Sequence, residues 1–167
     1  CRNNGYAIST PVQDQFRGDG IVSRAAGYGM RSIRVDGNDA LAVHQATAEA
    51  RKVAIDLNRP VLIEAMTYRR GHHSTSDDST RYRSAAEIQH WGEKFNPVVR
   101  FKQHLELNEW WDDDQDTILR DKIRVEVLTA LEVAENREKP HWDELFNDVY
   151  EELPQHLKEQ KEALREH

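Results

Sequence analysis

The stretch from Met66 to Ser84 holds the densest group of side chains that could do chemistry. It reads M-T-Y-R-R-G-H-H-S-T-S-D-D-S-T-R-Y-R-S, with four arginines, two adjacent histidines, two adjacent aspartates and seven serine or threonine hydroxyls. It follows the apolar run that begins at Val61, so these polar groups come at the end of an expected buried strand. Such donors favour the binding of an anion, and the hydroxyls are sites at which a kinase could add a phosphate.

The adjacent histidines, His72 and His73, allow more than one interpretation. A zinc site with Asp77 or Asp78 is disfavoured, because adjacent histidines project in different directions and no Cys or further His lies at a usual ligand spacing. For His73, hydrogen bonding to a phosphate or proton transfer near neutral pH competes with an ordinary loop histidine. The residues alone leave these two alternatives open.

A second candidate group lies at the start of the chain. Asn3-Asn4-Gly5 has the composition of a turn with positive φ, and a plain turn is one interpretation. The other is a Mg²⁺ site, because an Asn carbonyl oxygen suits this cation, which usually shares its ligands with a phosphate. Arg2 could pair with that phosphate. The tripeptide Gly18-Asp19-Gly20 matches the start of a thiamin diphosphate motif, but no Asn follows at the motif's distance, so a surface turn is predicted there.

A strand, a helix and a second strand are expected to position these residues. Residues 31–36 alternate as a short strand, and apolar positions from Ala40 to Asn58 recur every three or four residues, which indicates an amphipathic helix. Val61 to Met66 is a nearly continuous apolar run, typical of a parallel strand covered on both faces. The order predicts a βαβ unit, and such sheets bind ligands beyond the carboxyl ends of their strands.

The chain becomes helical beyond Ser84. Ser84 and Glu87 have the spacing of a capping box, Pro97 is expected to start a helix that runs to about Asn108, and the longest helix is expected from Asp112 to about Asn136. Pro154 opens a last helix with a narrow apolar stripe. We therefore divide the chain into an α/β part, residues 1–83, and a helical part, residues 84–167.

Composition and charge exclude some classes of protein. With 167 residues, 38% of them hydrophobic and 32% charged, the chain fits a soluble globular protein with a core, and no stretch of eighteen apolar residues could span a membrane. Residues 1–100 carry 14 Lys and Arg against 11 Asp and Glu, whereas residues 101–167 carry 9 against 19. The first part suits a small anionic ligand better than nucleic acid. The only cysteine is Cys1, which excludes an intrachain disulfide and permits a reducing compartment.

Several motifs together resemble one family, the alpha subunit of the branched-chain 2-oxo acid dehydrogenase decarboxylase component. They are C-R-N-N-G-Y-A-I-S-T-P, F-R-G-D-G-I, S-I-R-V-D-G-N-D, I-E-A-M-T-Y-R, G-H-H-S-T-S-D-D-S, Y-R-S and W-W-D, and they run in register along nearly the whole chain. The G-H-H-S-T-S-D-D-S block is the most specific. Pyruvate-type alpha subunits are similar in outline but carry Gly-His-Ser with Ser-Asp-Pro there, and they remain an alternative, as does a non-catalytic interaction fragment.

The resemblance implies a thiamin diphosphate-binding fold of the transketolase type, with a partial parallel sheet and flanking helices. It implies oxidative decarboxylation of branched-chain 2-oxo acids and reductive acylation of a lipoyl carrier. The implied partners are a beta subunit in an α₂β₂ heterotetramer, a lipoyl-bearing acyltransferase core, and a regulatory kinase and phosphatase. The implied compartment is the mitochondrial matrix.

The resemblance also assigns roles to individual residues. Asn4 and the main chain of Tyr6 match Mg²⁺ ligands, Arg2 and Arg69 match contacts of the cofactor diphosphate, and Ile8 would lie near the thiamin. His73 matches a catalytic histidine at the diphosphate end that supports transfer to the lipoyl group. Ser74, and secondarily Ser84, match the phosphorylation sites of the kinase.

The chain begins with Cys1 in what reads as the tail of a strand, so we expect it to be part of a longer protein whose targeting peptide would precede it. The family's Gly-Asp-Gly motif, a further Mg²⁺ carboxylate and a K⁺ site would lie upstream. The 167 residues alone are therefore expected to be inactive.

Overall fold

The computed structural model describes residues 1–166, and these divide into two compact units after Asp112. The division lies later than the expected boundary between residues 83 and 84, because the first two helices of the expected helical part belong to the first unit.

Three parallel strands in the order β1-β5-β4 form the centre of the first unit. They are β1 (Arg2–Asn3), β4 (Arg31–Asp36) and β5 (Val61–Met66). In the observed register both Asn3 and Asp36 lie opposite Met66. All three strands therefore end at the same edge of the sheet, where Asn4, Gly37 and Thr67 follow.

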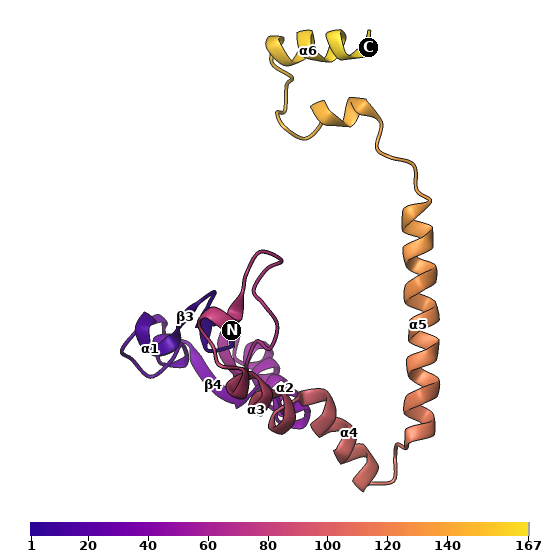
Figure 1. Cartoon of the computed structure of the whole chain (residues 1–167). Coiled ribbons are helices and arrows are strands. Elements are labelled where there is room, and N and C mark those ends of the chain that lie inside the picture. Colours follow the sequence, from indigo (N-terminus) through magenta and orange to yellow (C-terminus); the bar gives the residue numbers. More distant parts are fainter. Residues whose placement is uncertain (167) are drawn as a thin grey trace. The chain divides into compact units, whose positions relative to one another are not determined.

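The helix α2 (Ala40–Asp56) connects β4 to β5, which confirms the predicted βαβ unit (Figure 1). The helix begins where expected because the Asp39 side chain accepts hydrogen bonds from the N–H groups of Leu41 and Ala42, each at 3.0 Å. Gly37 N–H donates to the carbonyl oxygen of Met66 at 2.7 Å, so the loop into α2 stays close to the end of β5.

The predicted parallel strand is confirmed as β5, but the prediction that it is covered on both faces was wrong. Most of its residues are half-buried, and its one fully buried side chain is that of Glu64, which is 0% exposed. Among the described residues, the buried side chains comprise those of Ala25 and Ala50 and four polar ones, Asn38, Glu64, Ser79 and Arg83. Polar side chains therefore make up much of the interior of the first unit. A buried polar side chain must form hydrogen bonds, because its burial without them costs free energy.

The other elements of the first unit surround the sheet. A small antiparallel hairpin and two short helices lie between β1 and β4, and a 3₁₀ turn and two helices follow β5. They are β2 (Tyr6–Ala7), β3 (Thr10–Pro11), α1 (Val12–Gln15), η1 (Val22–Tyr28), η2 (Ser79–Arg81), α3 (Ala85–Lys94) and α4 (Pro97–Leu107). Ser84 caps α3 by accepting from Glu87 N–H at 3.1 Å, and Pro97 starts α4, so both predicted starts are confirmed.

The second unit contains three helical elements, α5 (Asp113–Glu135), η3 (Trp142–Phe146) and α6 (Gln155–Arg165). The predicted long helix is α5, and many of its apolar side chains are exposed, including Ile118 at 69% and Val127 at 60%. An ion pair of 3.0 Å between Lys161 and Asp143 joins α6 to η3.

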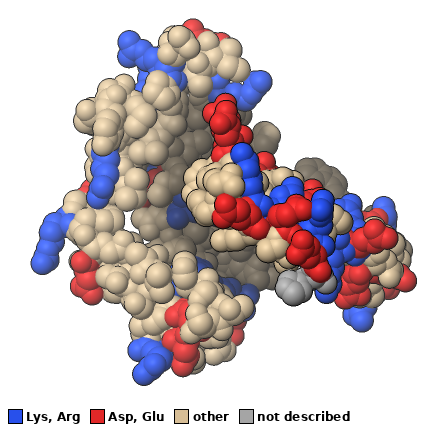
Figure 2. Space-filling view, turned by 90° about the horizontal axis from the view of Figure 1, so that it is seen from above, with Lys and Arg blue, Asp and Glu red and all other residues tan. Residues whose placement is uncertain are grey.

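On the face of the chain drawn in Figure 2, basic side chains are interspersed with acidic ones. No helix within residues 1–166 is long and apolar enough to cross a membrane.

Candidate functional site

A cleft of about 530 Å³ opens at the shared edge where the three strands end. It brings together three of the residues that sequence reasoning selected, Arg2, Asn4 and Arg69. The full lining comprises Arg2, Asn4, Gly37, Val43, Ala65, Thr67, Tyr68 and Arg69. The only charged side chains in this lining are two arginines, so the cleft suits an anion.

The turn that carries Asn4 is closed by two consecutive side-chain hydrogen bonds. The Asn3 side-chain oxygen accepts from Gly5 N–H at 3.1 Å, and that of Asn4 accepts from Tyr6 N–H at 3.1 Å. Gly5 adopts a φ of 82°, which only glycine enters at no steric cost. The predicted turn is thus confirmed, and each Asn oxygen retains a second lone pair.

Ile8 adopts an unusual backbone conformation beside this turn. Its φ is 56°, in the left-handed region, where a β-branched residue is strained. Its carbonyl oxygen accepts a hydrogen bond of 2.6 Å from Nη2 of Arg69, which fixes the conformation from the loop side. The Ile8 side chain is 52% exposed. The strain therefore occurs at a position that the family resemblance places near the thiamin.

A chain of hydrogen bonds leads from Arg69 into the loop that follows β5. Arg69 Nη2 donates to the hydroxyl of Tyr82 at 2.9 Å, and this hydroxyl donates to Asp77 Oδ2 at 2.6 Å. The same carboxylate oxygen accepts from the main-chain N–H of His73 at 2.8 Å. Hydrogen bonds from His73 and Tyr82 lower the pKa of Asp77, so it remains ionised and able to accept both bonds.

Arg83 closes the base of the same loop from the buried side. It is 4% exposed, and its guanidinium group donates to the carbonyl oxygens of Arg69 and, at 3.0 Å, Gly71. The guanidinium carbon lies 5.1–5.6 Å from the ring centroids of Tyr6, Tyr68 and Tyr82. This cation–π contact was not predicted from the sequence. The one feature that could have indicated it is the adjacent pair Tyr82 and Arg83 in the Y-R-S motif.

The predicted phosphorylation sites lie in different surroundings. Residues 70–76 are exposed, and Ser74 Oγ lies 3.2 Å from Ser76 Oγ. Ser84 is also exposed, but its hydroxyl is the N-cap of α3. The His73 side chain is exposed near Ser74, whereas His72 Nδ1 accepts from Ser79 N–H at 3.1 Å. The catalytic and regulatory roles of His73, Ser74 and Ser84 stay predictions.

Sequence reasoning missed Glu64, which accepts four hydrogen bonds. Oε1 accepts from Asn3 Nδ2 at 2.8 Å and Ile21 N–H at 3.0 Å, and Oε2 accepts from Val22 N–H at 2.9 Å and Arg34 Nε at 3.2 Å. Burial alone would raise its pKa, but these four donors lower the pKa of Glu64 to about 2. The single acid within an apolar run was the signal that could have revealed it.

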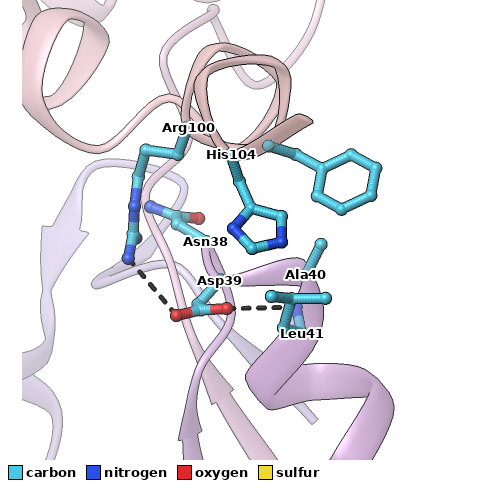
Figure 3. A pocket seen from close by; sticks show the side chains of 7 residues that line it. Asn38, Asp39, Ala40, Leu41, Arg100 and His104 are labelled. Atoms are coloured by element: carbon cyan, nitrogen blue, oxygen red, sulfur yellow. Dashed lines mark hydrogen bonds and ion pairs between the residues drawn. The ribbon is translucent and has the colours of Figure 1, made fainter. Parts of the chain in front are cut away.

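The other groups at the strand ends connect the sheet to α4. Thr67 donates from its hydroxyl to the buried Asn38 at 2.7 Å. Figure 3 shows Arg100 reaching from α4 toward Asp39 at the start of α2, at 3.5 Å, and it also pairs with Asp36 at 2.8 Å. A small cavity of about 120 Å³ lies between these groups and His104, which is among its lining residues. These contacts hold the neighbouring elements at the edge where the larger cleft opens.

The residues at the cleft fit a diphosphate and a hard cation better than a metal site made of protein ligands alone. Two arginines line the cleft, with the Nη1 group of Arg69 not used in the bonds described above, and the Asn4 oxygen retains one lone pair, as a cation that shares its ligands with a phosphate requires. Within residues 1–166 no three His, Cys, Asp or Glu side chains are placed to hold a metal together.

An α/β sheet with an anion site at its carboxyl edge is consistent with a cofactor-binding domain. The family model of the dehydrogenase E1 component matches residues 1–143, and the chain belongs to this family. Its curated relatives include the mitochondrial 2-oxoisovalerate dehydrogenase subunit alpha of Caenorhabditis elegans, 54% identical over 167 residues, which cover 100% of this chain and 38% of the relative.

Two further relatives carry the same kind of name. Subunit alpha 2 of the Arabidopsis thaliana enzyme is 57% identical over 166 residues, 99% of this chain and 35% of the relative. The human subunit alpha is 53% identical over 167 residues, 100% of this chain and 38% of the relative. The chain thus spans little more than a third of their length. Because 2-oxoisovalerate is a branched-chain 2-oxo acid, the resemblance drawn from the motifs is confirmed.

Proposed function

We propose that the chain is part of the alpha subunit of a branched-chain 2-oxo acid dehydrogenase that uses thiamin diphosphate and Mg²⁺. The observation that carries this proposal is the cleft in which Arg2, Asn4 and Arg69 meet at the carboxyl ends of parallel strands. The relatives' names supply the substrate class. The α/β architecture would then be a thiamin diphosphate-binding fold of the transketolase type. The names of the relatives also suggest mitochondria as the compartment.

The residues of this chain would divide the work of holding the cofactor. Arg2 and Arg69 would neutralise the diphosphate, while the Asn4 side chain and the Tyr6 carbonyl group would give oxygen ligands to Mg²⁺. When bound, thiamin diphosphate supplies the electron sink for loss of carbon dioxide from the 2-oxo acid. Ile8 would lie against the thiamin, and His73 would hold or move a proton near the diphosphate end during transfer to the lipoyl group. The remaining Mg²⁺ carboxylate and a K⁺ site would come from other parts of the subunit.

The assembled full-length subunit with its partner chain provides the test. We expect decarboxylation of 3-methyl-2-oxobutanoate to be faster than that of pyruvate. Replacing either Arg2 or Arg69 by Ala should weaken thiamin diphosphate binding by roughly 10- to 100-fold, because each removes a hydrogen bond between charged groups. Arg59→Ala, at an exposed position outside the cleft, is the matched control and should leave the affinity unchanged. Preference for pyruvate, or unchanged binding in both cleft variants, would refute the proposal.

The loop supports regulation by phosphate at Ser74. The Ser74 carbonyl oxygen accepts from Asp77 N–H at 3.2 Å, so a phosphate would add about two negative charges close to the Asp77 carboxylate. Repulsion would displace the Asp77 carboxylate, weaken the bonds that it accepts from His73 N–H and the Tyr82 hydroxyl, and disorder the loop beside the diphosphate. We expect Ser74→Glu to lose activity and to be cleaved faster by trypsin at Arg70 than the neutral control Ser74→Gln. Full activity of Ser74→Glu with unchanged cleavage would exclude this mechanism.

A phosphate at Ser84 should act differently. Ser84 is the N-cap of α3, and added negative charge at a helix N-terminus is favourable. We therefore propose Ser74 as the inhibitory site and Ser84 as a site of smaller effect, served by one kinase and its opposing phosphatase.

The second unit supports assembly with a beta subunit in an α₂β₂ heterotetramer that serves a lipoyl-bearing acyltransferase core. Contiguous apolar side chains of α5 are exposed, among them Leu119, Ile123 and Leu131 at 41%, 46% and 52%. Exposed apolar surface of this kind is typical of an interface between subunits. Co-expression with the beta subunit should give a stable complex, and Ile123→Asp should weaken it. The polar-face control Lys122→Asp should not. If Ile123→Asp left the complex intact, this face of α5 would not be the interface.

A further inference from the structure

Glu64 binds groups that belong to three separate segments. Its side chain is 0% exposed and lies within β5, yet its donors come from β1, β4 and the start of η1. The two carboxylate oxygens have different partners. Oε1 faces Asn3 in β1, whereas Oε2 faces Arg34 in β4, which also pairs with Asp19 at 2.9 Å.

The contact with Asn3 determines how the Asn3 amide is turned. An ionised carboxylate only accepts hydrogen bonds, so Asn3 must direct its NH₂ group toward Glu64. Its carbonyl oxygen then necessarily points the other way, where it accepts from Gly5 N–H at 3.1 Å. Without the carboxylate the amide would be free to rotate, and the turn would lose the acceptor that closes it.

That turn is the one that presents the proposed metal ligands. The main-chain carbonyl of Asn3 accepts from Thr67 N–H at 2.9 Å, so the turn begins at a fixed point on β5. Gly5 follows with its φ of 82°, and Asn4 then closes on Tyr6 N–H at 3.1 Å. The direction of the Asn4 side-chain oxygen therefore depends on these few bonds, and the position of Tyr6 depends on them together with the bond of 2.9 Å from Val12 N–H to the Gly5 carbonyl.

We propose that Glu64 is a positioning residue which, by orienting Asn3, sets the turn from Asn3 to Tyr6 in the geometry that a diphosphate-bound divalent cation requires. The inference rests on the proposed function, because it takes Asn4 and Tyr6 as the ligands. Residues that orient metal ligands without touching the metal typically change its affinity 10- to 100-fold when replaced.

The test measures binding of Mn²⁺, a paramagnetic substitute for Mg²⁺, to the assembled full-length protein at saturating thiamin diphosphate. Asn3→Asp keeps the oxygen that faces Gly5 but puts a second carboxylate against Glu64. We expect it to raise the Mn²⁺ dissociation constant by about 10-fold or more, and Glu64→Gln to do the same. In the double variant the Gln amide can donate to the Asp carboxylate, so the dissociation constant should return to within about 2-fold of that of the parent protein.

Arg34→Gln is the matched control, because it removes a partner from the other carboxylate oxygen. It should lower the melting temperature while leaving the Mn²⁺ constant within about 2-fold of the parent protein. If Glu64→Gln does not assemble, Asn3→Asp decides alone, because it leaves the other three donors to Glu64 in place.

Comparison of Asn4→Ala with Asn3→Asp and Glu64→Gln distinguishes an error in the role of Glu64 from an error in the proposed ligand set. If Asn4→Ala weakens Mn²⁺ binding but Asn3→Asp and Glu64→Gln do not, Glu64 has only a structural role and the inference is wrong. If Asn4→Ala also leaves binding unchanged, the cation is not held at this turn, and the proposed ligand set is wrong with it. Equal loss in both single variants without recovery in the double variant would likewise exclude action through the contact between Asn3 and Glu64.

Discussion

The two sides of the cleft are held in different ways. On the strand side, Glu64 is fully buried and accepts bonds from main-chain and side-chain donors. On the loop side, residues 70–76 are exposed, and the hydrogen bonds converge on Asp77 and on the buried Arg83. Segments with few buried contacts open at lower free energy than the rest of a fold. The strand side is therefore preorganised, and the loop side can be switched.

The largest effect is expected from removing the buried acceptor of the strand side. Glu64→Leu keeps a similar volume but leaves four donors without a partner, so the free energy of unfolding should fall by roughly 3–5 kcal/mol. Urea unfolding of the assembled protein measures this. Glu49→Leu, at an exposed position of α2, is the control and should change the free energy by less than about 0.5 kcal/mol. Equal losses in the two variants would show that the strand side is not specially anchored.

The protonation of Glu64 gives the next effect. Its pKa is lowered to about 2 from 4.5 in the unfolded chain, so below 4.5 the unfolded state binds more protons than the folded one. The stabilisation is complete above pH 4.5 and is lost as pH falls toward about 2. Urea midpoints between pH 6 and pH 3 should therefore fall more steeply in the parent protein than in Glu64→Gln. Parallel curves would mean that Glu64 is not ionised in the fold.

A smaller and more local effect is expected on the loop side. Asp77→Asn weakens the bonds to His73 N–H and the Tyr82 hydroxyl, so trypsin should cleave at Arg70 faster, on the order of 10-fold. Global stability should change little. Asp78→Asn is the neighbouring control, because within residues 1–166 the Asp78 side chain accepts hydrogen bonds from Thr80 alone. If Asp78→Asn increased cleavage as much, Asp77 would have no special part in holding the loop.

The smallest effect belongs to the capping hydroxyl at the end of the loop. Ser84→Ala removes the acceptor for Glu87 N–H and should cost about 1 kcal/mol, whereas Ser84→Asp restores an acceptor and should recover most of it. Thermal unfolding of the two variants measures the difference. An unchanged melting temperature in Ser84→Ala would indicate that α3 is fixed by its packing alone.

The sequence predicted the parts of the fold that depend on periodicity. The period of α2 and the run that forms β5 predicted the βαβ unit and a ligand site beyond the end of β5, whereas the family resemblance placed Asn4 and Arg69 at one site. The capping pattern from Ser84 to Glu87 likewise depends on neighbours three residues apart.

The contacts that could not be predicted join residues far apart in sequence. Glu64 meets Asn3 across 61 positions and Ile21 across 43, and nothing in an apolar run indicates which donors will surround its one acid. The aromatic environment of Arg83 is of the same kind, since Tyr6 comes from the other end of the unit. Long-range contacts also explain why the helices α3 and α4 belong to the first unit. The Tyr6 hydroxyl donates to Glu87 of α3 at 3.1 Å, and Arg100 of α4 forms an ion pair with Asp36.

Two glycines at the cleft differ in what limits their replacement. At Gly5 a side chain would find open space, and the constraint is the φ of 82°, so Asn is the most acceptable substitute. At Gly37 a Cβ atom would lie 2.8 Å from the carbonyl oxygen of Met66, so even Ala would force the ends of β4 and β5 apart. A survey of tolerated substitutions should therefore find that Gly5 accepts residues that readily adopt positive φ, whereas Gly37 rejects every larger side chain because of its size.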